Sequence, residues 1–161
     1  MIRLLASLFA RGEPALSEAS PRDAAAMALL HAASFQRGWS EHEVESLLVE
    51  RHVIAHCATI GGKLIGFVMS RLVEDEAEIL SIAVAGSRQR RGLARNLLHL
   101  HLRRLAGFGA RTVFLEVDEH NRPAVRLYDR AGFHEISRRP NYYPAAGGKP
   151  AAALVLRRDL A

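Results

Sequence analysis

The stretch Ile79-Leu80-Ser81-Ile82-Ala83-Val84 is followed, after a short turn, by Gln89-Arg90-Arg91-Gly92-Leu93-Ala94. The first six residues are typical of a buried β-strand, and residues 93–105 repeat leucines at helical spacing. The turn between them therefore leads into the N-terminus of a helix. Unpaired backbone N–H groups and the helix dipole favour an anion at that position. The stretch predicts a phosphate-binding turn between a strand and a helix.

The side chains of this turn leave two interpretations open. Gly92 and Ala94 are small where a ligand would approach the backbone, and Arg88 and Arg95 add positive charge. An arginine-rich loop that only caps a surface helix explains the same residues equally well. The Walker-type string G-x-x-x-x-G-K-[ST] and the dinucleotide fingerprint G-x-G-x-x-G are both absent. These two classes of phosphate site are therefore disfavoured.

The residues before the turn read as alternating strands and helices. Ser20-Pro21 and the capping box Ser40 to Glu43 mark the starts of two helices. Gly61-Gly62 separates two β-rich runs, as expected of a two-residue hairpin. These signals predict a strand over 13–19, helices over 20–34 and 40–50, and strands over 53–60, 64–72 and 76–84.

The pattern changes again after the leucine-rich helix. Residues 112–117 alternate with period two, which predicts a strand. Asn121 is a helix-capping residue and Gly132 ends that helix. Strands are predicted over 133–138 and 152–157, with a polar, glycine-rich loop over 141–150 between them. The order of elements is β-α-α-β-β-β-α-β-α-β-β.

The spacing Q-x-x-G-x-A at Gln89 resembles the acetyl-coenzyme A loop of the GCN5-related N-acetyltransferase (GNAT) family, and most of all its RimI-like branch of ribosomal-protein-alanine N-acetyltransferases. The resemblance runs from about residue 35 to residue 156. It is carried by Leu115-Glu116-Val117, Asn121 to Tyr128, Gly132-Phe133 and Arg138 to Pro144. It implies an α/β (α+β) fold with a mixed, mostly antiparallel sheet of about seven strands and about four helices. It also implies transfer of an acetyl group from acetyl-CoA to the N-terminal α-amine of a protein, such as a ribosomal protein beginning with alanine.

The resemblance also assigns residues to acetyl-CoA. The pyrophosphate would lie on backbone amides of the turn, the pantetheine arm on strand backbone, and Asn121 and Tyr128 on the thiol side. The cofactor-binding set it implies is Ile82, Ala83, Val84, Gln89, Arg90, Arg91, Gly92, Leu93, Ala94, Arg95, Asn121 and Tyr128. The side chains of Ile82 and Val84 are expected to pack in the core, and capping alone would explain Asn121.

Glu116 interrupts an apolar strand near its C-terminal end, where open α/β sheets place ligands. By composition alone it reads as an exposed glutamate at a strand end. The resemblance instead implies that Glu116 is the general base and that Tyr128 is the general acid that protonates the coenzyme A thiolate. Spacing alone allows Tyr128 to be a core tyrosine.

The resemblance places the acceptor peptide near Trp39, Arg138, Tyr142 and Tyr143, and it assigns the last three to the segment that walls the acceptor peptide in the family. Tyrosines covering the edge of the core are the other interpretation. One departure from the family stands out. Residues 136–158 contain no Asp or Glu, whereas RimI-like proteins carry acidic residues shortly before the last strand. The acceptor could therefore be an α-amine, a lysine or a small amine.

The composition predicts one globular domain over residues 1–161, because 49% of the residues are hydrophobic and 24% are charged. A lone Cys57 excludes an internal disulfide and favours a reducing compartment, so we expect a cytoplasmic monomer. Residues 1–11 are compatible with a short amphipathic helix packed on its own domain, and too short for a signal or membrane segment.

A metal site and an RNA-binding surface are two other possibilities, and the residues support neither well. The eight histidines show no metal-ligand spacing, so no metal is expected. The net charge of +5 and the arginines of residues 88–104 would also suit an RNA-binding module. That alternative lacks an aromatic RNA-binding motif.

Overall fold

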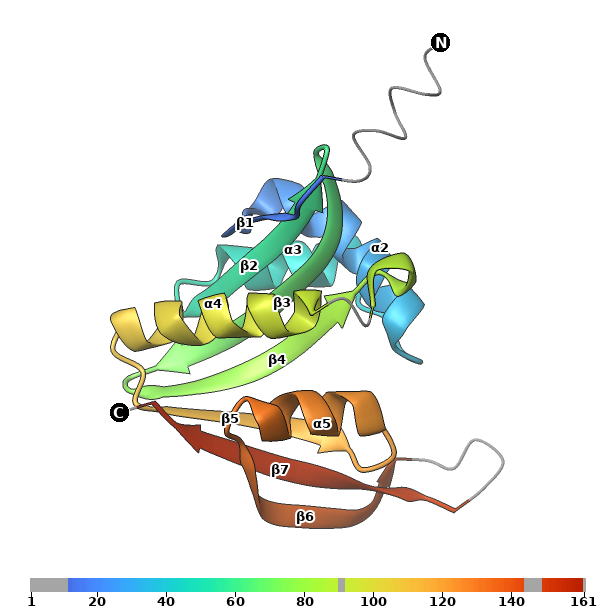
Figure 1. Cartoon of the computed structure of the whole chain (residues 1–161), viewed down its shortest axis with the longest axis vertical. Coiled ribbons are helices and arrows are strands. Elements are labelled where there is room, and N and C mark those ends of the chain that lie inside the picture. The colour runs from blue at the N-terminus through green and yellow to red at the C-terminus, as the bar shows by residue number, and fades with distance from the viewer. Residues whose placement is uncertain (1–11, 90–91, 144–148, 161) are drawn as a thin grey trace.

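The computed structural model describes residues 12–89, 92–143 and 149–160. Its seven strands form one mixed sheet in the order β1-β2-β3-β4-β5-β7-β6 (Figure 1). The strands are β1 (Ala15–Glu18), β2 (Val53–Ile60), β3 (Lys63–Val73), β4 (Glu76–Val84), β5 (Thr112–Asp118), β6 (His134–Tyr143) and β7 (Ala151–Asp159). The helices are α2 (Ala24–Ser34), α3 (Glu41–Val49), α4 (Leu93–Gly107) and α5 (Arg122–Arg130), with 3-10 turns at η1 (Pro21–Asp23) and η2 (Gly86–Arg88). The predicted fold class and element order are confirmed.

The local signals act as the sequence predicts. The Ser40 hydroxyl accepts a hydrogen bond from Glu43 N, and the Glu43 carboxylate accepts one from Ser40 N, so the capping box starts α3. Gly61 and Gly62 have φ angles of 57° and 79°, which match the two left-handed positions of a tight hairpin turn. This turn pairs β2 with β3 in antiparallel register.

The helices cover the two faces of the sheet differently. Helices α4 and α5 lie on the near face in Figure 1, and α2 and α3 lie behind β2 and β3. One buried cluster joins α4 to residues of β4, β5 and β7 and includes Tyr128 of α5. A second cluster joins α2 and α3 to Phe67, Met69 and Ala83. We call these the α4/α5 face and the α2/α3 face of the sheet.

Strands β4 and β5 are the one parallel pair among the described strands, and they stay paired only briefly. The pairing runs from Glu76 with Thr112 to Glu78 with Phe114, after which the two strands diverge (Figure 1). Just beyond this point β4 carries a bulge. Ser70 of β3 pairs with Ile79 and Met69 pairs with Ser81, so Leu80 is an extra residue in β4. The sheet therefore opens between β4 and β5.

The predicted loop over 141–150 was wrong for residues 141–143. These residues belong to β6, which continues past the predicted strand end at Arg138. Pro140 reads as a strand breaker, but β6 is the edge of the sheet, where a missing N–H is tolerated. Asn141 has a φ of 56°, and the register shifts between Arg139 and Tyr143, so an irregularity absorbs the extra residues.

Candidate active site

The turn before α4 has the geometry expected of an anion site. Gly92 is the N-cap of the 15-residue helix, with a φ of 77°, and a Cβ added to it would meet nothing within 4 Å. The Gln89 side chain donates a hydrogen bond to the Val84 carbonyl oxygen, which ties the turn back to β4. Helix α4 therefore begins at a left-handed glycine whose Cβ position is open, a feature that lets an anion approach the backbone closely. Arg90 and Arg91, both predicted to bind the cofactor, lie outside the described residues.

The other residues predicted to bind the cofactor lie on the two elements that flank this turn. Ala83 and Val84 are buried at the end of β4, and Ile82 packs partly buried against the core of the α4/α5 face. Leu93 is buried at the start of α4, followed by the exposed Arg95. Side chains such as Val84 and Leu93 fill the core, so a ligand here would meet chiefly backbone.

Glu116 lies two residues beyond Phe114, the last residue of β5 that pairs with β4, where the two strands diverge. Its neighbours Leu115 and Val117 point into the core of the α4/α5 face, so strand alternation puts Glu116 on the α2/α3 face. With 32% of its side chain exposed, Glu116 has its Oε1 3.4 Å from Arg139 Nη2. Arg139 also lies over the Tyr142 ring, at 5.6 Å from its centroid.

Tyr128 lies on the other face of the sheet from Glu116. It is 5% exposed in the α4/α5 core and packs edge to face on Phe133, with ring centroids 5.6 Å apart. Burial raises the pKa of the Tyr128 hydroxyl well above its ordinary value of 10. Tyr128 therefore keeps its proton at neutral pH.

The residues predicted at the acceptor side divide into two groups. Trp39 is held by His31, whose ring stacks on the indole at 4.2 Å and accepts a hydrogen bond from Trp39 N. Tyr142 and Tyr143 end β6 with their rings edge to face at 5.2 Å. Burial, and then Glu116, raise the pKa of Tyr143. The tyrosine pair and Glu116 are thus neighbours.

Arg138 belongs to a different group of charges. Its guanidinium donates to Glu119 Oε2 at 2.9 Å and to Glu135 Oε1 at 3.1 Å. Glu119 Oε1 accepts from Ala152 N, and this bond lowers the pKa of the Glu119 carboxyl. Arg138 therefore ties the end of β5 to the β6–β7 pair, while Arg139 is the arginine at Glu116. Glu116 pairs with Val155 of β7, which in turn pairs with Ser137 of β6, and Arg139 lies two residues beyond Ser137 on the same face of the sheet. Strand alternation along β6 was therefore the signal that separates Arg139 from Arg138.

Asn121 caps α5, since its side chain accepts from Ala124 N at 3.4 Å. This confirms the predicted cap. Its predicted contact with the cofactor is not needed to explain the residue.

A buried histidine pair was missed by the sequence reasoning, which considered only spacing along single elements. His56 Nδ1 lies 2.7 Å from His101 Nδ1, and His101 Nε2 lies 2.6 Å from Ser70 Oγ. These residues come from β2, β3 and α4. Within residues 12–89, 92–143 and 149–160, no group of three His, Cys, Asp or Glu residues is arranged to hold a metal ion.

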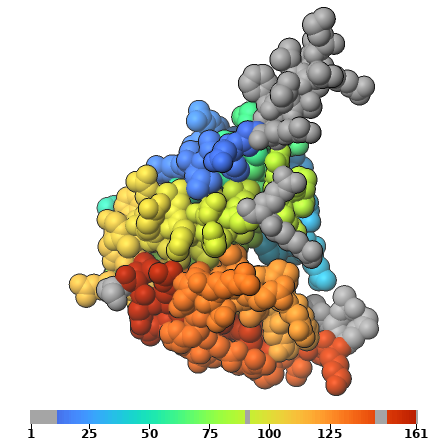
Figure 2. Space-filling model, viewed as in Figure 1, coloured from blue at the N-terminus to red at the C-terminus, as the bar shows by residue number. Residues whose placement is uncertain are grey.

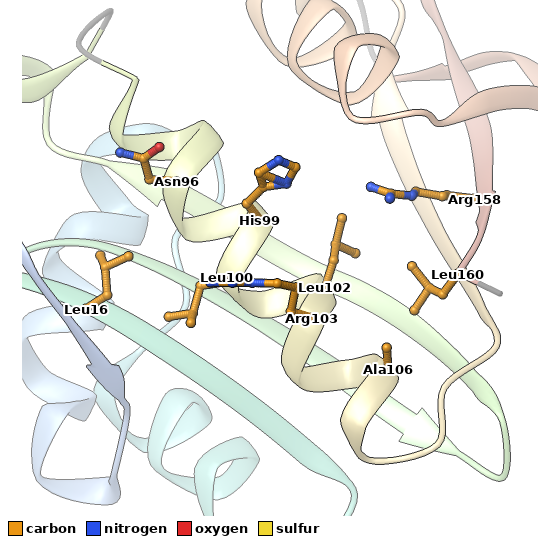
Figure 3. Close-up of a pocket in the computed structure, with 9 residues that line it drawn as sticks. All are labelled: Leu16, Asn96, His99, Leu100, Leu102, Arg103, Ala106, Arg158 and Leu160. Carbon is orange, nitrogen blue, oxygen red and sulfur yellow. The ribbon is translucent and has the colours of Figure 1, made fainter.

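A pocket of about 590 Å³ lies on the outer side of α4, away from Glu116. Figure 3 shows Leu16 on one side of the helix and Arg158 and Leu160 on the other, with Asn96 and His99 toward its N-terminal end. None of the residues predicted to act in catalysis lines it. Figure 2 shows the surfaces of α4 and α5 side by side on this side of the molecule. No helix in the described part of the chain is long and apolar enough to span a membrane.

Residues 24–133 match the model of the acetyltransferase (GNAT) family. The chain is 38% identical over 117 residues to the [ribosomal protein bS18]-alanine N-acetyltransferase of Escherichia coli K12, covering 73% of this chain and 78% of that protein. A protein of the same name from Haemophilus ducreyi is 36% identical over 93 residues, which cover 58% of this chain and 64% of that protein.

Solved structures show the same similarity to acetyltransferases. The crystal structure of the Escherichia coli ribosomal-protein-S18-alanine N-acetyltransferase superimposes with a TM-score of 0.86 at 30% identity, covering 92% of this chain and 95% of that one. Arabidopsis thaliana NAA60 in complex with a bisubstrate analogue has the same fold, with a TM-score of 0.80 at 21% identity and coverage of 91% and 98%. The chain therefore belongs to the GNAT family of acetyltransferases, enzymes that take the acetyl group from acetyl-CoA.

Proposed function

We propose that the protein acetylates the N-terminal α-amine of a protein, with Glu116 as general base and Tyr128 as general acid. The Escherichia coli relative is named for acetylation of an alanine of ribosomal protein bS18, and a ribosomal protein beginning with alanine is the acceptor we propose here. Acetyl-CoA is the donor, and its diphosphate fits the open N-terminus of α4 at Gly92.

One observation carries this assignment. The sheet opens between β4 and β5, with Glu116 on the α2/α3 face and Tyr128 on the α4/α5 face. An amine that enters from the first face meets a carboxylate, and a thiol that leaves toward the second face meets a protonated phenol. The base and the acid thus lie on opposite faces of the sheet at the point where β4 and β5 diverge, where we propose that the acetyl group is transferred.

The proton transfers follow from these positions. Glu116 takes a proton from the acceptor ammonium, directly or through water, and the amine nitrogen bonds to the acetyl carbonyl carbon. As the carbon–sulfur bond breaks, Tyr128 gives its proton to the thiolate. Glu116 passes its first proton to solvent and then takes the remaining extra proton from the nitrogen, and the tyrosinate regains a proton from solvent. The products are an acetylated amine and the free thiol.

Proton chemistry favours an α-amine over a lysine. An α-amine has a pKa of ~7.7 to 8.0 and a lysine ~10.4, so lysine costs roughly 3.4 kcal/mol more to deprotonate at the same pH. For the Glu116 carboxylate, which is one third exposed, the free-energy cost of removing a proton is therefore smaller with an α-ammonium than with a lysine ammonium.

Mass spectrometry tests the proposal. The protein is incubated with acetyl-CoA and an alanine-initiated peptide that also contains one lysine, with the α-amine either free or blocked. We expect acetylation of the free peptide at its α-amine and no product from the blocked peptide. Glu116→Gln and Tyr128→Phe should each lower kcat about 10²-fold or more.

The matched control is Asp118→Asn, which removes the next carboxylate on the same face of β5. Its kcat should stay within about threefold of the wild type, since the general-base role rests on Glu116 alone. Equal activity in Glu116→Gln and Asp118→Asn would remove Glu116 from the mechanism. Acetylation of lysine in the blocked peptide would assign the acceptor to the other amine class.

A further inference from the structure

Ser81 is a buried hydroxyl that lacks a hydrogen-bond partner among the described residues. It is 7% exposed and lies in β4, where the bulge at Leu80 follows the last residue paired with β5. A buried serine is normally hydrogen-bonded, because an unpaired buried hydroxyl destabilises the fold. Ser70 shows the usual case: it is fully buried one strand away and bonds His101. The unpaired hydroxyl at Ser81 points to a ligand that supplies the missing bond.

The position of Ser81 identifies the ligand. Ser81 pairs with Met69, a member of the α2/α3 cluster, so both Ser81 and Glu116 belong to the α2/α3 face. The pairing between β4 and β5 ends at Glu78 and Phe114; Ser81 follows Glu78 by three positions in β4, and Glu116 follows Phe114 by two in β5. The two side chains thus stand on facing strands at the start of the divergence. The common neighbour of both groups would be the acceptor nitrogen.

We infer that the Ser81 hydroxyl accepts a hydrogen bond from one N–H of the acceptor amine, so that Ser81 and Glu116 together aim the nitrogen lone pair at the acetyl carbon. This inference rests on the proposed function. A neutral primary amine has two N–H bonds and one lone pair. Two acceptors fixed on opposite strands leave the lone pair free for attack. The bond strengthens as the nitrogen gains positive charge, so it favours the transition state over the bound amine.

The chemistry predicts a preference for primary over secondary amines. A peptide that begins with N-methylalanine loses one N–H and places a methyl group where one of the two acceptors would bind. In the wild type, kcat/KM should be much lower for this peptide than for the alanine peptide. Ser81→Ala should lower kcat/KM for the alanine peptide about tenfold and leave the KM for acetyl-CoA unchanged. The ratio of kcat/KM for the alanine peptide to kcat/KM for the N-methylalanine peptide should fall by a similar factor, because the variant has no hydroxyl to bind the second N–H. We call this ratio the peptide ratio.

The control is Ser70→Ala, the buried serine that already has a partner. It should lower Tm by breaking the bond to His101 and leave the peptide ratio at the wild-type value. Ser81→Ala should keep or raise Tm, because an unpaired buried hydroxyl is removed. Ser81→Cys, with a weaker acceptor atom of similar size, should give an intermediate peptide ratio.

The outcomes separate this inference from the proposed function. An active wild type, together with a Ser81→Ala peptide ratio equal to that of Ser70→Ala, would overturn the role of Ser81 and leave the α-amine activity standing. A Ser81→Ala variant with a lower Tm and an unchanged ratio would do the same. A wild type that acetylates no peptide α-amine would overturn both.

Discussion

Arg139 shows how a single residue can set the access of an amine to Glu116. Its guanidinium is 3.4 Å from the carboxylate and stacks on Tyr142, yet 58% of its side chain is exposed. Exposed ion pairs of this kind contribute little to stability. In the proposed mechanism the acceptor ammonium comes to the same carboxylate, so Arg139 and the substrate would be competing cations.

Arg139→Gln should therefore lower the KM for an alanine peptide about two- to fivefold at low salt, with the KM for acetyl-CoA unchanged. Steady-state kinetics in 20 to 200 mM salt measure the effect, which should shrink as salt screens the pair. Arg157 provides a matched control. It pairs with Asp159 and lies 5.6 Å from the Phe114 ring, so it makes the same kinds of contact, but among the described residues its ion pair is to Asp159 and not to Glu116. A higher peptide KM in Arg139→Gln alone would mean that the arginine binds the acceptor.

At this scale the sequence predicted Glu116 and Tyr128 as a pair of candidates, and it named Arg138 on the acceptor side without naming Arg139, the arginine that pairs with Glu116. Arg138 and Arg139 are indistinguishable by charge, and only strand alternation separates the face toward Glu116 from the other one. The unpaired hydroxyl of Ser81 could not be predicted either, because the sequence of an apolar strand does not show whether a serine within it is hydrogen-bonded. Such differences depend on contacts between strands far apart in the chain.

At the scale of the element, the helix α4 is fastened to the sheet by a polar contact as well as by leucines. His101 is fully buried and bonds both Ser70 of β3 and His56 of β2. Burial, and then the neighbouring His56, lower the pKa of His101 from 6.5 to about 3. Burial also lowers the pKa of His56; the charge of Glu18 acts to raise this pKa and that of Arg104 to lower it. Both contacts of His101 can form with each imidazole neutral.

Because the folded protein holds His101 neutral, the unfolded chain binds the proton first as the pH falls. The free energy of unfolding should therefore be undiminished above about pH 6.5 and decline by about 1.4 kcal/mol per pH unit for this group on the way to pH 3. His101→Gln removes this titration and keeps a polar side chain of similar size.

Urea unfolding at pH 7 and pH 5 measures the effect. The wild type should lose more stability between the two pH values than the His101→Gln variant, and His99→Gln, an exposed neighbour on α4, should behave like the wild type. Equal losses in the wild type and in His101→Gln would show that His101 is protonated in the folded protein.

The elements themselves were largely predictable, and the reasons are local. The capping box at Ser40, the Gly61-Gly62 turn and the leucine spacing of α4 each act within a few residues, so sequence alone specified them. The prediction of where β6 ends was wrong because the edge position of this strand, which permits Pro140, is a property of the whole sheet. The early divergence of β4 from β5 has no local signal for the same reason.

At the scale of the molecule, one core joins the two parts of the sheet that β4 and β5 separate. The cluster on the α4/α5 face contains residues of β2, β3 and β4 as well as β5 and β7, with Leu105 of α4 fully buried among them. Only three residue pairs link β4 to β5, so this shared core is the main connection between the parts. We expect the chain to unfold as one unit.

Leu105→Ala should lower the free energy of unfolding by about 2 to 5 kcal/mol. Trp39, the single tryptophan, packs against the other cluster, on the α2/α3 face. Its fluorescence and the far-ultraviolet circular dichroism should therefore give coincident urea transitions at the new midpoint. Leu29→Ala, at a leucine that is 74% exposed on α2, should change stability by less than about 0.5 kcal/mol. Separate transitions in the Leu105→Ala variant would mean that the two faces unfold independently.

Strand β6 forms an open edge of the sheet, and its ten residues are exposed except for the partly buried Tyr143. An edge of this length is a template on which a second chain can add a strand, the first step toward aggregation. The middle of β6 works against such growth. Arg138 and Arg139 bring like charges together in any stacked copy, Pro140 has no N–H to donate, and Asn141 turns into the left-handed region. The β6 residues next to the proposed acceptor site thus also protect the protein from self-association, so a substitution made there to change acceptor binding would also weaken this protection.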